Sequence, residues 1–167
     1  MFITSFRRRV MEAAQAHGGM IDKFIGDGAL VVFGVPDPSA QDAARAFAFA
    51  DDLLRRIERW NEKRRFEPPL RIGIGIHTGE VYCGLVGDEE RIEFTVLGDA
   101  VNVASRLEQA TKRYGVPVLA SQEAVVAAGL AAKWREVAEE VLRGRVGATR
   151  IMGPAQRAAS SSLVAAS

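Results

Sequence analysis

Apolar residues recur along this chain with two periods, one typical of helices and one typical of strands. Apolar side chains three or four residues apart predict three longer helices, at about 5–17, 39–63 and 99–113. Ser39 is expected to cap the second of these helices, and Ser121 is expected to cap a further short helix. Apolar runs and alternating patterns predict strands on both sides of Asp27 and over 70–77, 80–86, 94–97, 116–120, 134–141 and 146–152. Strands and hairpins interleaved with helices indicate an α+β fold, in which helices pack on a mainly antiparallel sheet.

The first predicted hairpin has a single carboxylate at its tip. Gly26, Asp27 and Gly28 are flanked on both sides by apolar residues that favour strands. Glycine lacks a side chain and permits positive φ, so a phosphate or a metal ion could approach the backbone closely at this turn. The alternative is an ordinary hairpin turn, and this segment alone does not separate the two interpretations.

Composition and charge exclude several classes of protein. The chain is 48% hydrophobic with a net charge of +1, which fits one domain with a core and gives no general attraction to nucleic acid or anionic membranes. Cys83 is the single cysteine, so no intrachain disulfide is expected and a cytoplasmic location is favoured. No stretch approaches the roughly 20 apolar residues that span a bilayer, so we expect no membrane insertion by this chain. We expect residues 1–153 to form the domain and residues 154–167 to form a flexible, low-complexity tail.

Three sequence blocks, in this order, resemble one known family. They are Lys23-Phe-Ile-Gly-Asp27 at the predicted hairpin, Gly73-Ile-Gly-Ile-His-Thr-Gly-Glu80, and the pattern Asn102-x-x-x-Arg106 on a predicted helix. Together they resemble the catalytic domain of class III adenylate and guanylate cyclases, over about residues 17–152. The resemblance implies a ferredoxin-like α+β sandwich and an enzyme that forms a cyclic nucleotide and pyrophosphate from a nucleoside triphosphate.

The resemblance also implies two divalent metal ions, Mg²⁺ or Mn²⁺, held by two aspartates. Asp27 matches the aspartate of the hairpin, whereas the other belongs to a Phe-x-Asp-Ile-x-Gly-Phe-Thr block on an inner strand that this sequence does not contain. One carboxylate is not expected to hold two Mg²⁺ ions tightly, and loss of an inner strand would leave unpaired strand edges. The chain is therefore either an amino-truncated cyclase or a degenerate domain. In both cases we expect weak or no cyclisation by this chain alone.

Base selection is implied for Lys23 and Thr95. In the family a lysine donates to the adenine ring and an aspartate or threonine contacts its exocyclic amine, whereas guanine-selective relatives carry glutamate and cysteine. The Lys23 and Thr95 pair therefore resembles the adenine-selective set and implies ATP as the substrate. The alternative is that Lys23 lies at a strand edge and Thr95 only fills a strand position.

Asn102 and Arg106 lie four residues apart, so on a helix they share one face and can address one ligand. The resemblance implies that Asn102 positions the ribose and that Arg106 stabilises charge on the phosphates in the transition state. The alternative is an exposed polar helix face. Arg143 and Arg145 lie where relatives use a basic residue on the terminal phosphates, and the sequence does not choose between them.

The resemblance further implies a head-to-tail homodimer, because the metal aspartates of one subunit face the base, ribose and phosphate residues of its partner. Two functions remain open. One is an adenylate cyclase catalytic domain, and the other is a non-catalytic cyclase-homology module that binds nucleotide or dimerises to regulate another protein. A diguanylate cyclase or polymerase-palm relative is disfavoured, because the sequence contains no Gly-Gly-Asp/Glu-Glu-Phe turn.

Overall fold

The computed structural model describes residues 2–87, 92–141 and 147–155. Within these residues the helices are α1 (Phe2–Ala16), α2 (Asp42–Arg64), α3 (Asp99–Tyr114), α4 (Gln122–Ala127) and the 3₁₀-helix η1 (Ala131–Lys133). The strands are β1 (Met20–Ile25), β2 (Gly28–Val32), β3 (Ile74–Ile76), β4 (Tyr82–Gly87), β5 (Ile92–Leu97), β6 (Val118–Ser121), β7 (Trp134–Glu140) and β8 (Thr149–Pro154). The α+β prediction is confirmed.

The strands form three sheets within the described part of the chain. One has the order β3-β6-β8-β7, in which β3 and β6 are parallel and the other neighbours are antiparallel. The others are the antiparallel hairpins β1-β2 and β4-β5. No strand hydrogen bonds join these sheets among the described residues, so β2 and β3 each have an edge without a strand partner.

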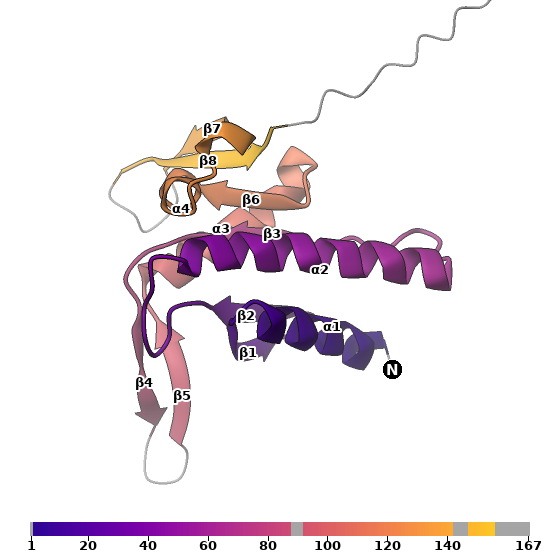
Figure 1. Cartoon of the computed structure of the whole chain (residues 1–167), viewed down its shortest axis with the longest axis horizontal. Coiled ribbons are helices and arrows are strands. Elements are labelled where there is room, and N and C mark those ends of the chain that lie inside the picture. The colour runs from indigo at the N-terminus through magenta and orange to yellow at the C-terminus, as the bar shows by residue number, and fades with distance from the viewer. Residues whose placement is uncertain (1, 88–91, 142–146, 156–167) are drawn as a thin grey trace, which may run out of the picture.

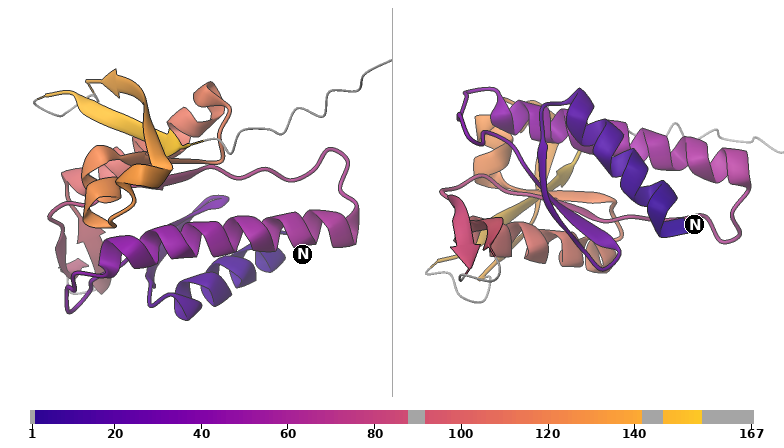
Figure 2. Two further views of the ribbon diagram at one scale, coloured as in Figure 1. Left: turned by 45° about the horizontal axis from the view of Figure 1, so that its top comes forward. Right: turned by 90° about the horizontal axis from the view of Figure 1, so that it is seen from below.

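Helix α2 supplies apolar side chains to two separate clusters of buried residues. Phe49 and Leu53 pack with Val10 of α1, whereas Phe47 and Ala50 pack with residues of β6 and α4. Accordingly α2 lies between the α1 and β1-β2 layer and the four-stranded sheet (Figure 1; Figure 2). The β4-β5 hairpin projects away from these layers as an arm (Figure 1).

Helix α3 packs against β3 and carries two candidate site residues. A Cβ atom added at Gly75 would lie 2.1 Å from the Ala104 carbonyl oxygen and 2.4 Å from the Glu108 amide nitrogen. Only glycine therefore allows the helix backbone to approach this strand so closely, as the alternating Ile and Gly pattern predicted. The strand itself is shorter than predicted, because only residues 74–76 pair with β6.

The predicted caps had different outcomes. Ser121 caps α4, because its hydroxyl accepts a hydrogen bond from the Ala124 amide over 3.2 Å. Ser39 does not cap α2, which begins at Asp42 after the N-cap residue Gln41. The Ser39 hydroxyl instead accepts from the Gln41 amide over 3.1 Å, so a local turn takes the place of the first helical turn.

Among the described helices, none is long and apolar enough to cross a membrane.

Candidate functional site

Lys23 of β1 and Thr95 of β5 lie together although 72 residues separate them in the chain. The Lys23 Nζ atom donates a hydrogen bond to Thr95 Oγ1 over 2.6 Å. The Thr95 residue is 8% exposed, so its hydroxyl depends on protein or ligand partners more than on bulk water. The structure thus brings together the two residues that the sequence implicated in base selection.

Asp22 is a component of this site that the sequence reasoning missed. Its carboxylate lies 3.2 Å from Lys23 Nζ, and its side chain is fully buried. Neither carboxylate oxygen accepts a hydrogen bond from the described residues, so the Lys23 ammonium is the charge that compensates it. The strand register shifts between Ile21 and Lys23, which identifies a bulge at Asp22. The sequence signal that could have identified Asp22 is its position directly before Lys23.

Asn102 and Arg106 lie one turn apart on α3, as predicted. Helix α3 begins directly after β5, with Gly98 at φ 146° as its N-cap residue, so the strand that carries Thr95 also leads into the helix that carries Asn102. Asn102 is exposed and Arg106 is half-buried, and neither side chain has a hydrogen-bond or ion-pair partner in the part of the chain that the structure describes. Both side chains are therefore available to a ligand.

Asp27 occupies the tip of the β1-β2 hairpin, in a two-residue turn with Gly26 between Ile25 and Gly28. Gly26 has φ 59°, and a Cβ atom at this position would meet nothing within 4 Å. The Asp27 side chain is exposed, and Arg7 Nη2 donates to the Gly26 carbonyl oxygen over 3.4 Å. The turn predicted from the sequence is confirmed, with its carboxylate open to solvent.

Comparison with known protein families identifies the family of this chain. The adenylate and guanylate cyclase catalytic domain family matches residues 3–151, which is most of the chain. The chain belongs to this family. As a cyclase domain it is of the class III type that the sequence blocks resembled, and class III cyclases typically use two metal ions.

Two curated relatives with at least 37% identity are named adenylate cyclases. This cyclase domain is 38% identical to adenylate cyclase 1 of Rhizobium meliloti (strain 1021) over 136 residues, which is 80% of this chain and 20% of that protein. It is 37% identical to the adenylate cyclase of Anabaena cylindrica over 130 residues, which is 74% of this chain and 25% of that protein. The chain therefore spans about a fifth to a quarter of the length of these relatives.

Solved structures agree on the fold. The adenylyl cyclase CyaB from P. aeruginosa superposes with a TM-score of 0.81 at 28% identity, covering 93% of this chain and 82% of that one. The guanylyl cyclase Cya2 superposes with a TM-score of 0.72 at 29% identity, covering 92% of this chain and 80% of that one. The fold of this cyclase domain therefore serves both adenine and guanine chemistry, and base choice must come from side chains.

The described residues of this cyclase domain do not fit a two-metal site. No group of three or more His, Cys, Asp or Glu side chains within ranges 2–87, 92–141 and 147–155 could hold a metal ion. Asp27 offers one exposed carboxylate, and Mg²⁺ keeps its water unless several oxygen ligands converge on it. Arg143 and Arg145, the candidates for the terminal phosphates, lie outside the described residues, as does most of the predicted tail, at 156–167.

Proposed function

We propose that this chain is the catalytic domain of an adenylate cyclase, which converts ATP to 3′,5′-cyclic AMP and pyrophosphate. The hydrogen bond of 2.6 Å between Lys23 Nζ and Thr95 Oγ1 is the observation that carries the proposal. It supports a joint role for two residues that are distant in sequence and lie together beside a buried acid, Asp22. Within this family, the two relatives that are named adenylate cyclases support the adenylate branch.

The chemistry of the pair suits adenine better than guanine. A lysine ammonium has three donors and no acceptor, so with one donor on Thr95 it can still donate to the adenine ring nitrogen N1. Guanine carries a hydrogen on N1, and that N–H would meet the Lys23 donor without an acceptor. The Thr95 hydroxyl retains acceptor capacity for the exocyclic amine of adenine, whereas guanine has a carbonyl oxygen there.

Asn102 and Arg106 supply the second part of the proposed site. The Asn102 amide can both donate to and accept from ribose hydroxyls, which would hold the 3′-hydroxyl near the α-phosphate. The planar guanidinium of Arg106 is always charged and presents paired donors that match phosphate oxygens. It would stabilise negative charge that develops on the phosphates as pyrophosphate leaves.

A second copy of the chain is proposed as the partner, arranged head to tail. The β4-β5 arm exposes large apolar side chains on both faces, since Tyr82 is 63% exposed, Leu85 70%, Phe94 46% and Leu97 49%. Such a concentration of exposed apolar surface typically marks an interface. In the proposed pair, Asp27 of one copy faces the Asn102 and Arg106 of the other.

Nucleotide binding by residues 1–167 tests the proposal. We expect calorimetry to give tighter binding of ATP than of GTP, and Lys23→Glu combined with Thr95→Cys to shift the preference toward GTP. Lys133→Glu, an equal charge change at an exposed residue of η1, is the control and should leave the ratio unchanged. An unchanged ratio in the double variant would refute the assignment. Cyclic AMP formation by this chain alone should be weak or absent, and robust cyclisation would overturn that expectation.

The second candidate is a non-catalytic cyclase-homology module, which the lone carboxylate of Asp27 favours. A mixing experiment separates the two functions. The chain is combined with a cyclase domain that retains both metal aspartates but lacks its base-selecting lysine. Cyclic AMP formation in the mixture supports the enzyme, because this chain then supplies Lys23, Thr95, Asn102 and Arg106. Heterodimer formation and ATP binding without cyclic AMP support the module.

A further inference from the structure

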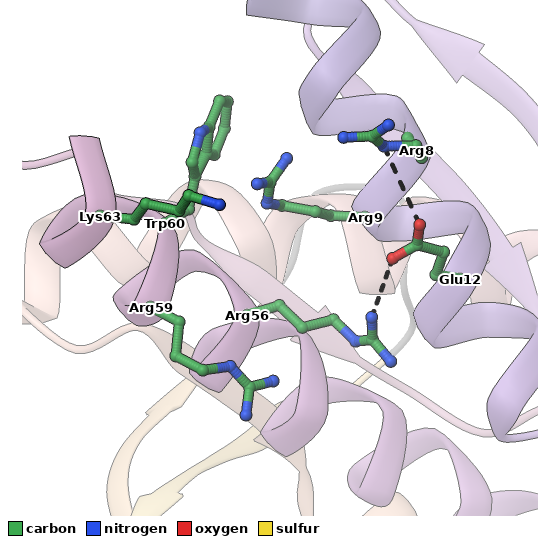
Figure 3. A pocket seen from close by; sticks show the side chains of 7 residues that line it. All are labelled: Arg8, Arg9, Glu12, Arg56, Arg59, Trp60 and Lys63. Atoms are coloured by element: carbon green, nitrogen blue, oxygen red, sulfur yellow. Dashed lines mark hydrogen bonds and ion pairs between the residues drawn. The ribbon is translucent and has the colours of Figure 1, made fainter.

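An open surface cavity of about 220 Å³ lies between helices α1 and α2 and shares no residue with the proposed nucleotide site. Five cationic side chains line this α1/α2 cavity, with Arg8 and Arg9 from α1 and Arg56, Arg59 and Lys63 from α2 (Figure 3). Such a concentration of one charge is unusual in a chain whose net charge is only +1. The lining residues therefore carry five positive charges against one negative charge, which favours an anion at the cavity.

The acidic residues around the cavity compensate only part of this charge. Glu12 is the one carboxylate among the lining residues, and it lies 3.0 Å from Arg56 Nη1 and 3.9 Å from Arg8 Nε. Arg56 also donates from Nε to Asp52 over 3.1 Å, so Glu12 and Asp52 both pair with Arg56. Arg59 and Lys63 have no side-chain hydrogen bond or ion pair with any described residue.

Arg9 is held in place at the cavity without a carboxylate partner. Its Nη1 atom donates to the Ser5 carbonyl oxygen over 2.8 Å, and its Cζ atom lies 4.0 Å from the centroid of the Trp60 ring. Burial, together with the neighbouring charge of Arg8, lowers the pKa of the Arg9 guanidinium. The positive charges thus destabilise one another in the free protein, and a bound anion would relieve this repulsion.

We propose that the α1/α2 cavity binds a multiply charged phosphate anion, either free or as the headgroup of a lipid. Guanidinium groups bind phosphate oxygens through paired hydrogen bonds, and Arg9 and Arg59 are the groups that remain uncompensated for this purpose. A volume of 220 Å³ holds on the order of seven water molecules, at roughly 30 Å³ each, which suits a pyrophosphate or triphosphate group. This inference does not depend on cyclase activity.

Fluorescence of Trp60 reports on the cavity directly. Trp60 and Trp134 are the two tryptophans of the chain, so Trp134→Phe leaves a single probe that contacts Arg9. In the full chain with this change, sodium pyrophosphate should shift the emission saturably, and added salt should weaken the binding. Arg59→Gln should raise the apparent Kd at least about fivefold, because it removes a charge-assisted contact. Arg59 is exposed, so we expect the variant to keep its melting temperature.

Two controls decide whether the signal comes from the cavity. Arg135→Gln changes an exposed arginine on β7 and should leave the titration unchanged. Arg106→Gln removes the phosphate-binding arginine of the proposed nucleotide site and should also leave it unchanged. No saturable shift, or equal weakening by Arg59→Gln and Arg135→Gln, overturns the proposal.

Vesicles distinguish the free phosphate from the lipid headgroup. The chain is mixed with vesicles of phosphatidylcholine that contain either phosphatidylglycerol or a phosphatidylinositol phosphate. Binding that requires the phosphatidylinositol phosphate and is displaced by pyrophosphate supports the headgroup as the source, and pyrophosphate binding without vesicle binding supports the free anion. Vesicle binding that pyrophosphate does not displace, or that Arg59→Gln does not weaken, overturns the proposal in favour of a general membrane-facing surface.

Discussion

The Asp22 carboxylate and the Lys23 ammonium lie 3.2 Å apart, although they are consecutive residues of one strand. Consecutive side chains of a regular strand point to opposite faces, so this pair could not form there. The register shift between Ile21 and Lys23 inserts Asp22 as an extra residue and turns its side chain toward the lysine. The bulge therefore gives Lys23 two neighbours, the buried Asp22 carboxylate and the Thr95 hydroxyl.

Asp22→Asn should weaken base selection. Without the carboxylate, the ammonium loses the opposite charge that holds it beside Thr95, so we expect ATP affinity to fall about tenfold, as for removal of one partner of an ion pair. The ratio of ATP to GTP affinity should fall with it, as measured by calorimetry. Asp51→Asn, at an exposed position of α2, should change neither value. A changed melting temperature with an unchanged affinity ratio would assign Asp22 a purely structural role.

Leu85→Ser should weaken self-association of the chain. Burying a leucine side chain contributes about 1.5–3 kcal/mol, so we expect the dimer dissociation constant to rise at least about tenfold in sedimentation equilibrium. Val126→Ser replaces an apolar residue of α4 that is 61% exposed and lies outside the β4-β5 arm, and it should leave the constant unchanged. A chain that stays monomeric at every concentration would contradict the proposed pairing.

Periodicity was sufficient for the helices but not for how they begin. The two serines show why, because they are the same residue type in similar sequence contexts. Ser121 is fully buried and accepts from the Ala124 amide, whereas the exposed Ser39 accepts from the Gln41 amide and donates its own amide to Asp42 Oδ2 over 2.5 Å. Which local hydrogen bonds form depends on tertiary surroundings that a pattern does not contain.

The candidate site was predictable only in part for a similar reason. The hairpin turn at Asp27 and the shared face of Asn102 and Arg106 follow from local spacing. The meeting of Lys23 with Thr95 does not, because it needs the arm and the first hairpin to be placed in space, and only the family resemblance indicated it. The contact between Asp22 and Lys23 was not predicted, because strand alternation places consecutive side chains on opposite faces.

Gly75→Ala should destabilise the domain strongly. The added methyl group would lie 2.1 Å from the Ala104 carbonyl oxygen, and backbone on both sides prevents an easy adjustment. We expect the free energy of unfolding to fall by about 3 kcal/mol, the upper part of the range for overpacking, as measured in urea. Gly28→Ala is the matched control, since its nearest atom would lie 3.5 Å away. Equal stability of the two variants would mean that α3 shifts away from β3 at little cost.

Glu140 links β7 to the end of α3, and its contribution to stability should depend on pH. A hydrogen bond from the Tyr114 hydroxyl lowers the pKa of the Glu140 carboxyl below its ordinary value of 4.5, against the opposing effect of burial, and Arg113 lowers it further. Arg113 Nη2 donates to both carboxylate oxygens, over 2.6 and 2.7 Å. Because the pKa is lower in the folded state, the stabilisation is present above pH 4.5 and is lost as the pH falls through the lowered value.

Glu140→Gln should therefore cost about 1 kcal/mol of unfolding free energy at pH 7 and progressively less at acidic pH. Urea unfolding of both proteins at pH 7 and at several values below 4.5 measures the difference. The neighbouring Glu139 is exposed and has no ion pair with the described residues, so Glu139→Gln should show a small difference that does not vary with pH. A Glu140→Gln difference that stays constant down to the lowest pH would mean that shape and neutral hydrogen bonding, rather than the carboxylate charge, join β7 to α3.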